Sequence, residues 1–178
     1  EAKHMLRVMR LGAGDEVTLF DGQGREGGFT IARADKNRAG LSPESLTEHP
    51  RPESRAVLAL GWAKSSRRGW LMEKSVELEA EGLWFWQAER SQGRVPDPPK
   101  ETWEAQTIAG AKQCGNPWLP ELRTLPGGAK DLAAAASEFD RCYLLWEEQG
   151  QERILNARDL EEPGRVLYVL GPEGGLSR

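Results

Sequence analysis

The chain has 178 residues, of which 38% are hydrophobic and 29% charged, and its formal net charge is −4. This hydrophobic content is sufficient for the core of one large or two small globular domains. The acidic balance argues against a protein that coats nucleic acid with its whole surface, so any contact with RNA or DNA must be confined to basic patches on one face.

The two cysteines, Cys114 and Cys142, lie far apart in the sequence and form no CxxC pair, which argues against a zinc site or a disulfide framework. Each lies in an apolar run or on the apolar face of a predicted helix, so we interpret both as core residues rather than nucleophiles. No apolar run reaches the about 18 residues of a membrane helix, and the first residues lack the apolar core of a signal peptide. We therefore expect a cytoplasmic protein without membrane or metal partners.

The first predicted elements form a β-hairpin. EVTLF at residues 16–20 and FTIARA at residues 29–34 are β-rich runs, and the intervening DGQGREGG has the composition of a turn. Residues 36–54 are polar and contain three prolines, so we predict loops there, with a linker between two domains near residues 49–54.

The turn of this hairpin contains Gly22, Gly24 and Gly27 in the GxGxxG spacing of dinucleotide-binding loops. That fingerprint requires a helix whose first amides meet a pyrophosphate. Because a strand is predicted next, we interpret these glycines as turn residues. A nucleotide-dependent oxidoreductase built on this motif would instead require a helix after Gly28.

Strands and helices alternate in the rest of the chain. The predicted strands are AVLALGW (56–62), LWFW (83–86), CYLLWE (142–147) and VLYVL (166–170). The predicted helices are GWLMEKSVELEAE (69–81), ETWEAQTIAGAKQC (101–114) and AKDLAAAASEF (129–139). Such alternation predicts an α/β domain with a mostly parallel sheet and helices on its faces.

The last strand runs into a glycine-rich segment, GPEGG at residues 171–175. It follows the carboxyl end of a predicted strand, where open α/β sheets bind ligands, and glycines allow a ligand to approach the backbone closely. An ordinary tight turn is the alternative, because this composition is favourable for turns in general. Ser177 then occupies the position of a helix N-cap with only Arg178 after it, so we expect the visible sequence to be incomplete.

Two small clusters of positive charge are candidates for binding phosphate. Arg7 and Arg10 are three residues apart and would share a face if their segment is helical. Lys64, Arg67 and Arg68 follow the end of a predicted strand. Both clusters fit a phosphate-binding footprint, and a solvated surface is the alternative for each.

Four stretches, in this order along the chain, resemble segments of the RsmE family of bacterial ribosomal RNA methyltransferases. They are HMLRVMRLGAGDEVTLFDG (4–22), LMEKSVELEAEG (71–82) with ERS (89–91), WEAQTIAGAKQCGNPWLPEL (103–122) and VLYVLGPEGGLS (166–177). The order of these stretches on the expected secondary elements makes the resemblance specific, and it spans nearly the whole chain.

The resemblance implies a methyltransferase that uses S-adenosylmethionine (SAM) to methylate N3 of a uridine in 16S ribosomal RNA. It implies a PUA-like β-barrel domain for RNA contact, which we place at residues 1–52. It also implies a SPOUT domain, an α/β fold with a trefoil knot, at residues 53–178. The implied partners are 16S rRNA or the small ribosomal subunit and a second copy of the chain, because SPOUT pockets are usually completed in a homodimer.

The resemblance also implies the positions of the binding residues. The residues implied to contact SAM are Leu145, Trp146, Glu147, Leu170, Gly171, Pro172, Glu173, Gly174, Gly175 and Leu176. For contact with RNA phosphates we select Arg7, Arg10, Lys64, Arg67 and Arg68. We assign no catalytic base, because Glu173, the carboxylate of the loop, can equally shape the turn or bond to the cofactor.

The chain departs from the family pattern at two points. In the family the GPEGGLS loop is followed by a helix, a strand and a motif similar to LGxRILRxETA, which this sequence lacks. The family also tends to have glycine where this chain has Glu79, so we expect the end of the central helix to be reshaped there. A noncatalytic RNA-binding protein that kept the PUA-like domain is the alternative function.

Overall fold

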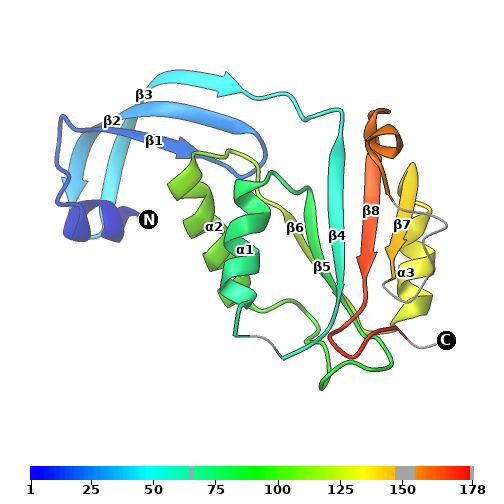
Figure 1. The fold of residues 1–178 in the computed structure, drawn as a ribbon. Helices are drawn as coiled ribbons and strands as arrows, with labels where there is room; N and C mark the ends of the chain where they lie inside the picture. Colours follow the sequence, from blue (N-terminus) through cyan, green and yellow to red (C-terminus); the bar gives the residue numbers. More distant parts are fainter. Residues whose placement is uncertain (65, 147–154, 177–178) are drawn as a thin grey trace. The chain divides into compact units, whose positions relative to one another are not determined.

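The computed structural model describes residues 1–64, 66–146 and 155–176. The chain divides into two compact units, Glu1–Arg51 and Pro52–Arg178 (Figure 1). Among the described residues, no helix combines the length and the apolar character needed to cross a membrane.

The first unit contains a short π-helix, η1 (His4–Val8), and an antiparallel sheet in the order β1-β2-β3. The predicted hairpin is confirmed: β1 (Glu16–Phe20) pairs with β2 (Arg25–Asp35). Its turn is held by Asp21, whose carboxylate accepts hydrogen bonds from the Gln23 amide at 2.7 Å and from Arg25 Nε at 2.7 Å. These bonds lower the pKa of Asp21. Because a strand follows the turn, the dinucleotide-binding alternative is wrong.

The prediction of loops over residues 36–54 is wrong for most of that segment. It contains the strand β3 (Arg38–Glu48), which pairs with β2 and forms an edge of the sheet. Pro43 lies where the β2–β3 register shifts, between Gly28 and Phe29. A proline is tolerated on an edge strand or at a bulge, because the missing N–H leaves no interior ladder bond unmade.

The second unit is an α/β domain with a wholly parallel sheet of five strands in the order β6-β5-β4-β8-β7, as its strand pairings show. The strands are β4 (Arg55–Gly61), β5 (Gly82–Trp86), β6 (Glu121–Leu125), β7 (Arg141–Leu145) and β8 (Arg165–Leu170). The predicted α/β fold is thus confirmed. The strand β6 was not predicted from the sequence, because it is an edge strand in which charged residues interrupt the apolar pattern.

Helices cover both faces of this sheet. Met72 of α1 (Arg68–Glu77) and Trp103 of α2 (Glu101–Cys114) pack with Leu83 and Phe85 of β5. On the other face, α3 (Ala129–Ala136) packs with Trp84 and Trp86, as the alternation of side chains along a strand requires. A short 3₁₀-helix, η3 (Ala157–Leu160), precedes β8.

Ion pairs to one buried carboxylate link the amino ends of β4, β5 and β8. Glu81 precedes β5, and its side chain is only 9% exposed. Its carboxylate accepts hydrogen bonds from Arg55 Nη1 at 3.1 Å and from Arg165 Nε at 2.7 Å. Charge-assisted bonds of this kind tie the amino ends of β4 and β8 to the residue that precedes β5, so this edge of the sheet has a structural role.

The prediction that both cysteines belong to the core is wrong, because Cys114 and Cys142 are exposed. Cys114 is the last residue of α2, and Gly115 ends that helix in the left-handed conformation. Cys142 lies on the edge strand β7, whose neighbour along the same face, Leu144, is 56% exposed. An edge strand with only partial cover leaves its apolar side chains accessible.

Candidate functional site

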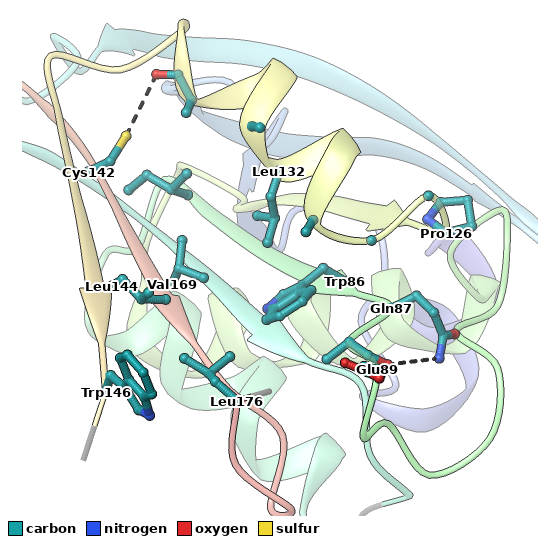
Figure 2. A pocket seen from close by; sticks show the side chains of 17 residues that line it. Trp86, Gln87, Glu89, Pro126, Leu132, Cys142, Leu144, Trp146, Val169 and Leu176 are labelled. Atoms are coloured by element: carbon teal, nitrogen blue, oxygen red, sulfur yellow. Dashed lines mark hydrogen bonds between the residues drawn. The ribbon is translucent and has the colours of Figure 1, made fainter. Parts of the chain in front are cut away.

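A cavity of about 820 Å³ lies at the carboxyl ends of the parallel strands, on the face that α3 covers (Figure 2). This volume is in the range of sites for small molecules, and strand carboxyl ends are where α/β sheets bind ligands. Four segments form its wall: residues 86–89 at the end of β5, residues 126–136 with α3, residues 142–146 at the end of β7, and Leu167, Val169 and Leu176 from β8 and the chain after it.

The sequence leaves this space open because α3 is rich in alanine. Leu132, Ala133 and Ala136 of α3 face the cavity, together with Ala129 at the start of the helix. Alanine side chains are too small to fill the distance between a helix and the sheet below it. Leu144 of β7 and Val169 of β8 form the floor, as Figure 2 shows.

The wall is mostly apolar, with a few polar groups. Gln87 and Glu89 contribute polar side chains, and Glu89 is the one charged residue among the described residues of the wall. The Gln87 side chain is engaged in its own loop, where it accepts from the Val95 amide at 2.9 Å and donates to the Gly93 carbonyl at 3.2 Å. The cavity therefore suits a ligand with a large apolar surface and a positive charge near Glu89.

Two further lining residues have polar atoms of interest. The indole N–H of Trp146 is buried and has no hydrogen-bond partner within the described part of the chain, so a ligand could satisfy it. Cys142 is exposed, but partial desolvation raises the pKa of its thiol, which disfavours the nucleophilic thiolate. The described residues include no group of three His, Cys, Asp or Glu side chains arranged to hold a metal ion.

The glycine-rich segment forms a tight turn at the edge of this cavity. The Gly175 amide donates to the Pro172 carbonyl at 2.8 Å, and Gly175 has a φ of 74°. The turn fits closely against the end of β4, because a Cβ on Gly61 would lie 2.4 Å from the nitrogen of Pro172. The Trp86 indole donates to the Leu170 carbonyl at 3.0 Å. These contacts fix the chain that leads into Leu176, which lines the cavity.

The structure brings together only some of the residues implied for SAM binding. Trp146 and Leu176 line the cavity. Leu145 and Leu170 alternate with the lining residues Leu144 and Val169, so they belong to the opposite face of the sheet. The turn from Gly171 to Gly175 carries Leu176 without lining the cavity itself, and Glu147 lies outside the described residues.

Two segments of the wall were not predicted from the sequence as parts of a site: residues 86–89 and residues 126–129. The second is a Pro-Gly-Gly loop between β6 and α3. A Cβ on Gly128 would lie 2.5 Å from the Gln87 carbonyl oxygen, so glycine allows the two segments to meet. Recognition of β6 would have identified this loop as a second turn at a strand end.

The basic residues selected for RNA contact occupy different settings. Arg7 is exposed in η1 and donates to Asn37 Oδ1 at 3.0 Å. The helix ends at Val8, and Arg10 follows it with a φ of 58°, so the two arginines do not share a helical face. Both side chains are nevertheless exposed in the first unit.

In the second unit, Lys64 and Arg67 are exposed, whereas Arg68 is half-buried. The guanidinium carbon of Arg68 lies 4.0 Å from the centre of the Trp62 ring, and Arg68 Nη2 donates to the Ala63 carbonyl. Burial lowers the pKa of Arg68. This placement favours packing on an aromatic ring over contact with a phosphate.

Comparisons with known proteins cover both units. Residues 50–178 match a family model described as an RNA methyltransferase domain. Residues 1–43 match one described as an RNA methyltransferase PUA domain.

Curated relatives are similar over the whole chain. The ribosomal RNA small subunit methyltransferase E of Bacillus subtilis (strain 168) is 25% identical over 187 residues, which cover 99% of this chain and 73% of the relative. The protein of the same name from Mycobacterium tuberculosis (strain CDC 1551 / Oshkosh) is 26% identical over 190 residues, covering 99% of this chain and 70% of that protein.

Solved structures show the same fold. A protein from Legionella pneumophila, assigned as a methyltransferase and solved with bound SAM, superimposes with a TM-score of 0.79 at 26% identity, over 99% of this chain and 73% of that one. The ribosomal RNA small subunit methyltransferase E of Neisseria gonorrhoeae has a TM-score of 0.75 at 21% identity, over 99% and 73% of the two chains.

Proposed function

The chain belongs to the RNA methyltransferase family, and we propose from this premise that it transfers the methyl group of SAM to N3 of a uridine in 16S ribosomal RNA. The observation that carries the proposal is the coincidence of two features in one unit. Residues 50–178 match the family, and the same residues form a ligand-sized cavity at the carboxyl ends of their parallel strands. The relatives named ribosomal RNA small subunit methyltransferase E support the rRNA substrate, and the resemblance to the RsmE family implies the N3 position.

The residues of the cavity fit SAM chemically. Leu144, Trp146 and Leu176 provide apolar and aromatic surface for an adenosine. The Trp146 N–H, which has no partner among the described residues, is a donor for one of its polar atoms. The Glu89 carboxylate would complement a positive charge. When bound, SAM supplies a methyl group made electrophilic by a positively charged sulfur.

The main task of the protein in this reaction is to hold two partners in line. Uracil N3 must approach the methyl group in a near-attack geometry, and a fixed wall around the cofactor supplies that orientation. N3 also carries a proton, which must leave before or during the transfer. We assign no residue to this step, since Glu173 is exposed at the tip of its turn.

We further propose that the first domain, residues 1–52, binds RNA and that residues 53–178 form the methyltransferase domain. Exposed Arg7 and Arg10 in the first and Lys64 and Arg67 in the second are the proposed contacts for RNA phosphates. The match of residues 1–43 to a PUA domain supports this division of roles. A homodimer in the cytoplasm is the proposed state of the enzyme.

Calorimetric titration of the protein with SAM tests the proposed function. We expect one site per chain with micromolar affinity or better. Failure to bind at millimolar SAM would contradict the proposal. If 16S rRNA still bound in that case, the result would support the noncatalytic RNA-binding alternative.

A further inference from the structure

The glycine-rich turn contains one peptide group whose orientation is fixed from both sides. This is the peptide between Gly174 and Gly175. Its N–H donates to the Pro172 carbonyl at 2.8 Å, and its C=O accepts from Arg90 Nη1 at 3.0 Å. Since a peptide group is planar, bonds at both of its ends fix the rotation of the whole plane.

Without such bonds this peptide would rotate readily. Glycine on both sides removes the steric barriers that hold other residues to one region of backbone angles. The bond inside the turn, from Gly175 to Pro172, involves only the turn itself. Arg90 provides the restraint from outside, because it belongs to the segment after β5.

The contact between Arg90 and the turn includes packing as well as a hydrogen bond. A Cβ on Gly174 would lie 3.3 Å from Arg90 Cβ and 3.8 Å from Arg90 Cδ, so the arginine stem covers the position that a side chain would need. The guanidinium also lies near Gly175, where a Cβ would be 3.7 Å from Arg90 Nη1. Glycine at 174 therefore allows this approach.

The restrained peptide leads directly into the cavity wall. Leu176 follows Gly175 and lines the cavity, and its side chain packs back on Gly171, where a Cβ would be 3.0 Å from Leu176 Cγ. A rotation of the Gly174–Gly175 peptide would therefore move Leu176. Glu89, the charged residue of the wall, immediately precedes Arg90, so one short segment supplies both a wall residue and the restraint.

We propose that Arg90 is a positioning residue for SAM, which holds the Gly174–Gly175 peptide in the orientation that shapes the cavity before the cofactor binds. This inference rests on the proposed function. Arg90 acts through the turn, and its charge-assisted bond to a carbonyl preorganises the site, so less of the binding free energy is lost to ordering the loop.

Hydrogen exchange of the cofactor-free protein tests the restraint directly. In Arg90→Ala we expect the Gly175 amide to exchange about tenfold faster, since loss of a hydrogen bond to a charged group allows the peptide to rotate more often. In the same variant the KM and the Kd for SAM should rise about tenfold with kcat nearly unchanged, as expected when an interaction common to the ground and transition states is removed.

Two further variants complete the experiment. Arg94→Ala removes the same charge from an exposed position in the same segment and should leave exchange and affinity as in the unmodified protein. Arg90→Lys keeps most of the stem and one donor, so it should recover part of the affinity even if Arg90→Ala disturbs the fold. The inference is wrong if both Arg90 variants show the same Gly175 exchange rate and the same affinity for SAM as Arg94→Ala. If the unmodified protein fails to bind SAM, the proposed function fails, and the exchange rate of Gly175 still decides whether Arg90 restrains the turn.

Discussion

At the scale of single residues, the charge of the cavity comes from Glu89. This is the one carboxylate among the described lining residues, and the rest of the wall is mostly apolar. Glu89 is exposed, so water screens part of its charge, but it is the carboxylate that this wall offers to a cationic ligand.

Replacement of Glu89 by glutamine should therefore weaken SAM binding about threefold, as expected for a partly screened charge. The affinity for S-adenosylhomocysteine, which lacks the sulfonium charge, should fall less. The ratio of the affinity for SAM to the affinity for this product should therefore decrease. Calorimetry with both compounds measures the difference. Glu104→Gln, an exposed position on α2, is the matched control. Equal losses for the two compounds would show that Glu89 does not recognise the charge.

Gly61 has a different role, since it allows the chain after β8 to pass the end of β4. A Cβ at this position would lie 2.4 Å from the Pro172 nitrogen and 2.6 Å from its Cδ, and both atoms belong to the turn. Gly61→Ala should lower the free energy of unfolding by about 1–3 kcal/mol, a typical cost of overpacking. Thermal unfolding checks this against Gly12→Ala, where an added Cβ would have no neighbour within 4 Å. Equal melting temperatures for the two variants would contradict the account.

At the scale of the element, the end of α1 carries local strain. The Glu79 amide donates to the Val76 carbonyl at 3.0 Å and the Ala80 amide to the Ser75 carbonyl at 2.8 Å, the two bonds of a Schellman motif. That motif requires a left-handed residue, and Glu79 has a φ of 56°. The reshaped helix end that the sequence predicted at Glu79 is thus a helix stop made without the usual glycine.

Glu79→Gly should stabilise the protein by about 1 kcal/mol, because a side chain in the left-handed region costs about this much. Glu77→Gly, at the last residue of α1, should have the opposite effect, since glycine is unfavourable inside a helix. Chemical denaturation distinguishes the two. A fall in stability for Glu79→Gly would show that the Glu79 side chain makes compensating contacts.

Elements with strong periodicity could be predicted from the sequence, whereas two of the edge strands, β3 and β6, could not. The apolar run of β8 and the helical face of α2 identified their elements without structural data. In β3 a proline and polar residues obscured the pattern, and in β6 charged residues did so. Both are edge strands, which are solvated on one side and carry fewer apolar residues. The part of the cavity wall that follows β6 was not predicted for the same reason. The contact between Arg90 and Gly174 joins positions 84 residues apart, so no local sequence pattern could have predicted it.

At the scale of the whole molecule, an acidic chain must bind an acidic polymer through limited basic patches. Each phosphate contact releases counterions, so the slope of log affinity against log salt measures the number of contacts. Replacement of Arg7 and Arg10 together by alanine should reduce this slope for 16S rRNA by about 2, and replacement of Lys64 and Arg67 should do the same. Lys36→Ala, which removes an exposed charge from the first unit, is the control. Unchanged slopes would exclude these residues from the RNA interface.

The central claim is that the cavity at the strand ends serves methyl transfer to rRNA. Its most direct test is incubation of the protein with SAM carrying a labelled methyl group and small ribosomal subunits that lack the modification, followed by mass spectrometry of the RNA nucleosides. The account predicts label in 3-methyluridine at a single site of 16S rRNA, and loss of that label when Leu176→Glu fills the apolar wall with charge. Label on another base or atom, or transfer that survives Leu176→Glu, would contradict it.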